Sequence, residues 1–210
     1  MNSKLVTEIE KREECLCILV NNAGIAPGKG QTSVDSAEAL KKEFYDTTTE
    51  KEWTDVYQTN VVAPFLMSMA FLPLIEKSTA THKGYSGTIV NISSISGHIR
   101  ISQGHFAYNS SKGATIQLNR MLAAEIAKCG IKVRVNSIAP GVFPSEMTTG
   151  ESSDETQKSE LPKSHKEHLP SQRPGKEEDM AAAILFVVGC QYLNGQTVTV
   201  DGGYEMQVGN

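Results

Sequence analysis

The sequence predicts an α/β fold in which helices cover both faces of a parallel β-sheet, a doubly wound arrangement. Four short apolar runs rich in β-branched residues recur along the chain, and helical patterns separate them. Each run ends in small or turn-forming residues. Short strands that are buried on both faces and separated by helices are typical of parallel sheets.

The expected strands lie at residues 15–20, 88–92, 131–138 and 196–200. They end, in that order, in the segments Asn21-Asn22-Ala23-Gly24, Ser93-Ser94, Ala139-Pro140-Gly141 and Asp201-Gly202-Gly203. In open α/β sheets, ligands bind beyond the carboxyl ends of the strands. We therefore expect the functional residues in and around these four segments.

A long helix is expected after the first strand. Thr49 and Glu52 have the spacing of a capping box, which predicts a helix that continues to about residue 75. Pro64 and Pro73 should bend or break it locally. Its second half is apolar on nearly all sides, so we expect it to be largely buried.

The other expected helices are shorter or more clearly amphipathic. One spans residues 105–128 and ends at Gly130, which suits a left-handed cap. Another spans residues 176–188 and opens with three acidic residues, which suit the positive end of a helix dipole. Short charged helices are expected at residues 37–44 and 5–14.

Two stretches show neither the apolar runs of the expected strands nor the periodicity of the expected helices. Residues 28–35 are rich in Gly, Ser and Thr, and residues 148–172 contain only Leu161 and Leu169 as large apolar residues. A segment with so few apolar side chains cannot bury itself well. We expect residues 148–172 to form a mobile substrate lid on a single domain that comprises residues 1–210.

Composition narrows the range of partners. The chain has 210 residues, with 20 Lys and Arg against 24 Asp and Glu, so its net charge is −4. This mildly acidic balance gives no argument for a nucleic acid as partner. The longest apolar run, residues 181–188, is too short to cross a bilayer, so no membrane partner is expected either.

The cysteines and the N-terminus indicate a cytoplasmic protein. The first residues are charged and contain no apolar segment of a secretory signal. The four cysteines form no C-x-x-C pair and are expected to be reduced. His165 and His168, with Glu residues nearby, are the alternative candidates for a metal site, but exposed positions on the lid are expected for them, and no metal is predicted.

Tyr108 and Lys112 are the residues that first indicate chemistry. Their i, i+4 spacing places them on one face at the start of a helix. A nearby ammonium favours the phenolate and lowers the pKa of a tyrosine, which otherwise lies near 10. Ser94 at a strand end can donate a hydrogen bond to a carbonyl oxygen, and Asn60 in a helix can hold a water that relays protons. Taken alone, the pair also fits a surface cation beside a half-buried tyrosine.

The order of several motifs resembles the short-chain dehydrogenase/reductase family. Asn-Asn-Ala-Gly follows the first strand, an Asn lies in the next helix, and V-N-I-S-S, Y-N-S-S-K, P-G and V-D-G-G follow in order, from about Leu16 to Gly203. The segments G-V-F-P-S-E-M-T and R-M-L-A-A-E look like those of 3-oxoacyl-(acyl-carrier-protein) reductases. The resemblance implies a Rossmann-like fold, reduction of a small-molecule carbonyl or oxidation of an alcohol with NAD or NADP, and a homodimer or homotetramer.

The resemblance also implies roles for individual residues. Tyr108 matches the family's proton donor and acceptor, and Lys112 matches the lysine that lowers the tyrosine pKa and binds the nicotinamide ribose. Ser94 matches the serine that orients the substrate carbonyl, and Asn60 matches the structural and relay asparagine. The residues that match the cofactor-binding segments, besides Tyr108 and Lys112, are Asn22, Ala23, Gly24, Pro140, Gly141, Phe143 and Ser145.

Two alternatives for these motifs were weighed. Gly24, Gly28 and Gly30 spell G-x-x-x-G-x-G after a strand, formally a phosphate-binding pattern, but the same strand end already matches Asn-Asn-Ala-Gly. A serine with a histidine would also fit a hydrolase, yet the sequence contains no G-x-S-x-G elbow.

The resemblance leaves part of the family's pattern unmatched. The family's glycine-rich turn and first three strands would precede the helix at residues 5–14, so we expect a sheet truncated at its N-terminal side. The strand at residues 15–20 would then be an unpaired apolar edge. Two functions follow: an oxidoreductase with a Ser-Tyr-Lys-Asn site, or a non-catalytic remnant of this fold that serves as a binding partner and cannot hold a dinucleotide.

Overall fold

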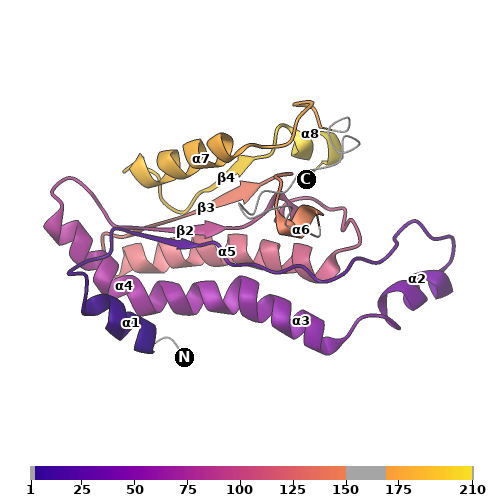
Figure 1. Ribbon diagram of the computed structural model, residues 1–210, viewed down its shortest axis with the longest axis horizontal. Helices are drawn as coiled ribbons and strands as arrows, with labels where there is room; N and C mark the ends of the chain where they lie inside the picture. The colour runs from indigo at the N-terminus through magenta and orange to yellow at the C-terminus, as the bar shows by residue number, and fades with distance from the viewer. Residues whose placement is uncertain (1–2, 150–168, 210) are drawn as a thin grey trace.

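In the computed structural model, residues 3–149 and 169–209 are described, and four strands among them form one sheet (Figure 1). All neighbouring strands are parallel, in the order β1-β2-β3-β4. The strands are β1 (Ile18–Asn21), β2 (Thr88–Ile92), β3 (Arg134–Pro140) and β4 (Thr197–Val200). The predicted parallel α/β sheet is therefore confirmed.

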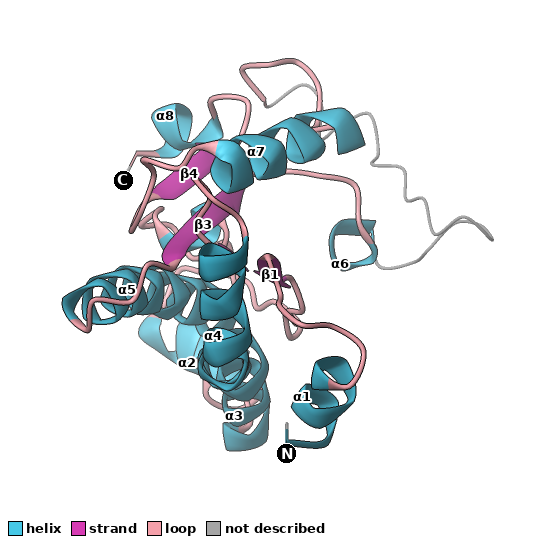
Figure 2. Cartoon of the chain, turned by 90° about the vertical axis from the view of Figure 1, so that its left-hand side faces the viewer, coloured by secondary structure: helices cyan, strands magenta, loops and turns pink. Residues whose placement is uncertain are grey.

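Helices lie on both faces of this sheet, which confirms the doubly wound arrangement. In Figures 1 and 2, α3, α4 and α5 cover one face and α7 covers the other. The helices are α1 (Ser3–Glu10), α2 (Ala37–Phe44), α3 (Glu50–Tyr57), α4 (Ala63–Thr81), α5 (Phe106–Lys128), α6 (Glu146–Thr149), α7 (Glu177–Gly189) and α8 (Tyr204–Val208).

Two strands begin three residues later than the apolar runs suggest. Ile18 pairs with Thr88 and Thr88 pairs with Arg134, so the β1–β2 and β2–β3 ladders both start level with the first residue of β2. A parallel ladder needs a neighbour at each position, and the residues before Thr88 belong to a turn. The start of β2 therefore decides where β1 and β3 begin.

The core consists of two apolar clusters, one on each face of the sheet. On one face Ile89 and Val135 pack against α4 and α5, in a cluster that includes Leu74 and Leu122. On the other face Val90 and Ile138 pack against Val187 of α7. Successive strand residues point to opposite faces, which explains why neighbours in sequence belong to different clusters.

The predicted long helix forms, with one irregular turn in it. Thr49 and Glu52 make both hydrogen bonds of the capping box at the start of α3. A π-helical turn, Gln58–Val62, then joins α3 to α4, and Pro64 lies at the start of α4. The helix continues through Pro73. By length and composition the stretch Glu50–Thr81 could cross a membrane, but in this fold α4 packs against β1 and β2.

The loop predictions have mixed outcomes. The loop at residues 28–35 is irregular, and α2 has the predicted bounds. Residues 150–168 of the expected lid, with His165 and His168, lie outside the described residues. The end of that segment is docked, since Leu169 is buried and the Ser171 N–H donates to the Gly202 carbonyl at 3.1 Å.

Candidate active site

The carboxyl ends of the strands open into a cavity of about 560 Å³. Ser94 and Tyr108 lie on its wall, together with Gly141 and Val142 from the segment after β3 and Tyr204 from α8. The structure therefore brings Ser94 and Tyr108, two of the residues that the sequence predicts for the site, to one cavity at the carboxyl ends of the strands. The other lining residues are Ala26, Lys29, Ile95, Ser96, Gln103, His105, Met147 and Thr148.

A glycine sets the separation between Ser94 and the helix that carries Tyr108. Gly97 ends the short 3₁₀ turn after Ser94, and a Cβ placed on it would lie 2.6 Å from the Lys112 backbone carbon and 2.7 Å from the Gly113 nitrogen. No larger residue fits at that distance, so the turn lies directly on α5. Ser94 accepts a hydrogen bond from the Ser96 N–H at 3.1 Å, which fixes its side chain.

The environment of Tyr108 keeps its hydroxyl protonated. Burial raises the pKa of Tyr108, and a hydrogen bond with Ser94 lowers it by a smaller amount. The Lys112 Nζ lies 5.6 Å from the centre of the tyrosine ring. Burial thus dominates in the protein without a bound ligand, and the phenol is a proton donor at neutral pH.

Lys112 is a buried cation with a lowered pKa. Its side chain is 4% exposed, and Nζ donates to the Ile92 carbonyl at 2.9 Å. Burial lowers the pKa of Lys112 to about 8 because the charged form has lost its hydration. The Lys112 side chain can therefore release a proton as the ammonium, and bind one as the amine, close to neutral pH.

Asn60 lies in the π-helical turn and is 1% exposed. Its side chain accepts from the Ile25 N–H at 2.9 Å and donates to the Ile25 carbonyl and to the Ser111 hydroxyl, both at 2.9 Å. Pro64 has no N–H to offer the Asn60 carbonyl four residues earlier, and the Thr115 hydroxyl donates to this carbonyl instead, at 2.8 Å. Asn60 therefore joins α3–α4, α5 and the loop after β1.

The expected cofactor residues fall into two groups. Gly24 lies beside the reactive residues, since a Cβ on it would be 3.3 Å from the Lys112 Nζ and 3.4 Å from the Asn60 Oδ1. Asn22 and Ala23 are exposed at the end of β1, and Gly141 lines the cavity beside Pro140. These residues surround one region at the carboxyl edge of the sheet.

Phe143 and Ser145 lie apart from Tyr108. The Phe143 ring covers Gly175, where a Cβ would meet it at 2.3 Å, and Phe143 lines a separate cavity of about 140 Å³. The Ser145 N–H donates to the Thr148 hydroxyl at 2.9 Å at the start of α6. The structure therefore brings neither side chain to the wall that holds Ser94 and Tyr108.

Sequence reasoning missed His105 as a site residue. It lies in the turn before Tyr108 and lines both the cavity above and a second cavity of about 430 Å³. Burial and the Lys29 cation lower the pKa of His105, against a hydrogen bond with the Pro27 backbone that raises it. Its position three residues before Tyr108, immediately before the start of α5, was the available signal.

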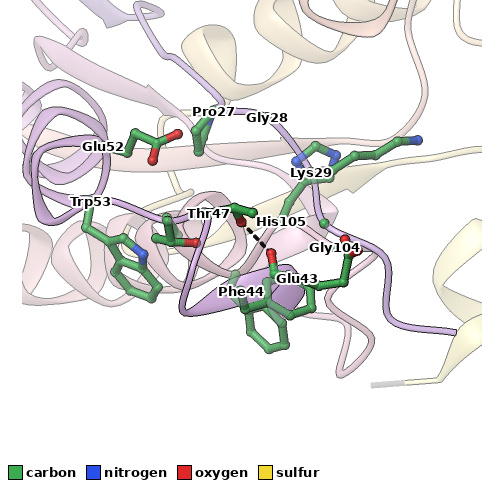
Figure 3. A pocket seen from close by; sticks show the side chains of 14 residues that line it. Pro27, Gly28, Lys29, Glu43, Phe44, Thr47, Glu52, Trp53, Gly104 and His105 are labelled. Carbon is green, nitrogen blue, oxygen red and sulfur yellow. Dashed lines mark hydrogen bonds between the residues drawn. The ribbon is translucent and has the colours of Figure 1, made fainter. Parts of the chain in front are cut away.

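The second cavity lies between the loop after β1 and the α2–α3 connection (Figure 3). In Figure 3, Phe44, Thr47 and Trp53 line one side, opposite Pro27 and His105. Gly30 closes its edge by donating its N–H to the Gly104 carbonyl at 3.1 Å. Gly28 and Gly30 of the G-x-x-x-G-x-G pattern thus belong to this loop contact, whereas Gly24 lies beside Lys112, and α2 begins only at Ala37.

Comparisons with known proteins agree with this arrangement. A family model described as enoyl-(acyl carrier protein) reductase matches residues 2–205. The rhamnolipid biosynthesis 3-oxoacyl-(acyl-carrier-protein) reductase of Pseudomonas aeruginosa is 32% identical over 193 residues, which cover 91% of this chain and 67% of the relative. The short-chain dehydrogenase/reductase PhomF of Diaporthe leptostromiformis is 31% identical over 207 residues, with 95% of this chain and 69% of the relative covered.

A solved structure shows the same relationship. The Pseudomonas aeruginosa RhlG/NADP active-site complex matches with a TM-score of 0.77 at 30% identity. The match covers 96% of this chain and 71% of the other. The chain spans about two thirds of the length of the two curated relatives.

Proposed function

The chain belongs to the short-chain dehydrogenase/reductase family, and we propose that it reduces a ketone on a small molecule, or oxidises the matching alcohol, with NAD or NADP as cofactor. One observation carries the proposal. Three parts of the chain converge at the carboxyl end of the sheet: Ser94 after β2, Tyr108 and Lys112 in α5, and Asn60 in the π-helical turn. The similar RhlG structure, which is described as an NADP complex, supports the choice of cofactor.

The residues present fit a nicotinamide and its ribose. Gly24 has no side chain to fill the space beside the Lys112 Nζ and the Asn60 Oδ1, so both groups can face a ligand. The groups that would hold the cofactor are Tyr108, Lys112, the segment from Asn22 to Gly24, and Pro140 with Gly141. When bound, the nicotinamide donates a hydride to a carbonyl carbon or accepts one from an alcohol.

The chain's own residues would manage the proton. Ser94 donates a hydrogen bond to the substrate oxygen and holds it beside Tyr108. Tyr108 gives its hydroxyl proton to that oxygen during reduction, and the Lys112 ammonium stabilises the phenolate that remains. A raised pKa keeps Tyr108 protonated in advance, which favours the reductive direction at neutral pH. Asn60 fixes the loop after β1 against α5, so Lys112 keeps its position.

The proposed substrate is a 3-oxoacyl thioester or a ketone of similar size. Two observations support this class. The cavity that holds Ser94 and Tyr108 is lined partly by the apolar side chains of Ile95, Val142 and Met147, which suit an acyl chain. The Pseudomonas aeruginosa relative is described as a 3-oxoacyl-(acyl-carrier-protein) reductase.

Tyr108→Phe tests the mechanism. Removing a positioned general acid costs about 10²- to 10⁴-fold in rate. We expect NADPH-dependent reduction of an acetoacetyl thioester to fall by that factor, with an unchanged melting temperature. Tyr57→Phe is the matched control, because Tyr57 lies in α3 against Trp53, and it should keep wild-type turnover. Near wild-type turnover in Tyr108→Phe would show that another group supplies the proton.

A second candidate function is a non-catalytic protein of the same fold. It is favoured by the edge of the sheet, where β1 pairs only with β2 among the described strands and leaves Ile18 and Val20 about 40% exposed. Calorimetry of the 210-residue chain with NADPH separates the candidates. Micromolar binding supports the enzyme, whereas a folded chain without measurable binding supports the non-catalytic candidate.

We propose a cytoplasmic homodimer or homotetramer as the working form. All four cysteines are free thiols, which suits a reducing compartment. The helices on one face of the sheet expose large apolar side chains that a second copy could cover. These residues are Trp53, Val62, Phe65, Leu66, Phe106 and Met121. Light scattering on the purified chain measures the oligomeric state.

A further inference from the structure

Two cysteines and a histidine meet near the amino end of the sheet, away from the candidate active site. Cys15 and Cys17 precede β1, and His82 follows α4. One ligand atom of each residue lies within 4.8 Å of the other two, and the Cys17 Sγ is 4.0 Å from the His82 Nδ1. We propose that these three side chains bind one metal ion of the zinc class, with a water molecule as the fourth ligand.

The backbone holds both cysteines in place before any metal binds. The Cys17 carbonyl accepts from the Thr88 N–H at 3.0 Å and from the Tyr85 hydroxyl at 3.2 Å. Between the cysteines, the Leu16 N–H donates to the Leu74 carbonyl at 3.0 Å. Both thiols lie at the end of α4, since the ligand atoms of Cys15, Cys17 and His82 are all within 4.8 Å of one another. The thiols of Cys15 and Cys17 contact each other.

His82 is equally well anchored. Its backbone N–H donates to the Ser78 carbonyl at 2.9 Å, where it ends α4. The ring Nδ1 lies 3.1 Å from the same carbonyl oxygen. Because Nδ1 is the ring nitrogen that faces the Cys17 Sγ, it is the atom that would bind the ion, and the ring proton would then be on Nε2. On binding, Nδ1 gives up its contact with the Ser78 carbonyl. The Tyr85 ring packs edge-on against the imidazole.

The donor set selects the class of metal. Two thiolates and one imidazole suit zinc and related soft or borderline ions, whereas magnesium and calcium require oxygen ligands. Tetrahedral zinc bonds of about 2.3 Å to sulfur and about 2.0 Å to nitrogen place the ligand atoms about 3.5–3.8 Å apart. The 4.0 Å separation of Cys17 and His82 therefore needs a shift of a few tenths of an ångström.

The site is open to solvent on one side. His82 is exposed, and Cys15 and Cys17 are partly buried, so an ion can enter from solution and keep a water ligand. Each thiol releases its proton to the buffer when it becomes a ligand, and no oxidation occurs. The bound ion would connect the segment before β1 with the end of α4, and it would stabilise the folded chain by mass action.

Cobalt titration of the untagged full-length chain in the presence of a phosphine reductant tests the proposal. Cobalt(II) occupies zinc sites and reports thiolate ligands through a sulfur-to-metal charge-transfer absorption. We expect saturation at one cobalt per chain and complete displacement by one equivalent of zinc. His82→Asn should bind at least tenfold more weakly, and Cys15→Ser should lose part of the charge-transfer intensity. His82 is exposed, so its variant should fold normally.

Cys129→Ser is the matched control, because Cys129 is an exposed free cysteine at the end of α5. The Cys129→Ser variant should keep the full cobalt absorption. Zinc should raise the melting temperature of this variant and of the wild type, but should not raise that of His82→Asn. Three results would overturn the proposal: no cobalt absorption in the wild type, equal absorption in His82→Asn, or loss of absorption in Cys129→Ser. A Cys15–Cys17 disulfide that persists under reductant would also overturn it.

Discussion

Lys112 and Arg134 are both buried cations, one near each end of the sheet, and the protein holds them in opposite ways. Lys112 is 4% exposed and Arg134 is 5% exposed. The Lys112 Nζ donates to a single carbonyl within the described residues, that of Ile92. Arg134 donates to the Ser86 hydroxyl and to four carbonyls at the end of α7 and the turn after it, those of Val187, Val188, Cys190 and Leu193.

The difference is one of compensation: Arg134 is paired with several acceptors, whereas Lys112 matches the cation of the proposed cofactor site. Arg134 satisfies carbonyls at the negative end of a helix dipole, so its burial is compensated. Among the residues that the structure describes, the Lys112 Nζ has no second hydrogen-bond partner, and it lies beside Gly24, which has no side chain. An incompletely satisfied buried cation in a cleft is a mark of a functional site, since folding alone would not favour it.

The largest expected effect comes from replacing Arg134, the buried cation whose donors are paired with several carbonyls. Arg134→Met leaves several buried carbonyls without donors, and we expect the free energy of unfolding to fall by about 3–5 kcal/mol. Urea unfolding measures it. Arg120→Met is the matched control at an exposed position of α5 and should change stability by less than about 0.5 kcal/mol. A loss below about 1 kcal/mol in Arg134→Met would mean that water replaces the guanidinium at these carbonyls.

Lys112→Met should show a pH-dependent effect of intermediate size. The folded-state pKa of Lys112 is about 8, below the value near 10.4 in an unfolded chain. Between these values the unfolded chain binds more protons, so the wild type gains stability as pH rises, by up to about 1.4 kcal/mol per pH unit from this group.

The Met variant lacks that gain. Urea unfolding at pH 7.5, 8.5 and 9.5 should therefore show the wild type gaining stability relative to Lys112→Met with each step in pH. Parallel pH profiles for the two proteins would contradict the depressed pKa. Turnover should be lost in the variant at every pH, because the ammonium beside Tyr108 is gone.

The smallest expected effect concerns the hydrogen bond between two uncharged groups, the Thr115 hydroxyl and the Asn60 carbonyl. Thr115→Val removes the hydroxyl that donates to the Asn60 carbonyl, and we expect a loss of about 1–2 kcal/mol for the unpaired buried carbonyl. Thr54→Val is the control, because the Thr54 hydroxyl bonds an exposed carbonyl in α3. A loss no greater in Thr115→Val than in Thr54→Val would argue that the Asn60 carbonyl finds another donor.

Local signals in the sequence predicted much of the fold. The capping box at Thr49 and the left-handed Gly130 depend on neighbours in sequence, and both are found as predicted. The i, i+4 spacing of Tyr108 and Lys112 likewise depends on neighbours in sequence, and both residues lie in α5 as predicted. The parallel order of the strands is confirmed by the ladders and by the solved relatives.

Contacts between distant residues could not be predicted. Arg134 lies within a run read as apolar, and only the end of α7, more than fifty residues later, explains its burial. The meeting of Cys15 and Cys17 with His82 depends on the docking of α4 against β1. Phe143 and Ser145 match the family's pattern in sequence, yet the structure turns that segment toward Gly175 and α6.

The π-helical turn at Gln58–Val62 also sets the rotational phase of the helix that follows it. One additional residue in a turn rotates everything beyond it by about 100° around the helix axis. The same continuous helix can therefore direct α3 toward α5 and α4 toward β1 and α1. A single-residue deletion in this turn would rotate the residues of α4 that contact β1 away from the sheet, so we expect the segment to be less tolerant of length variation than of substitution.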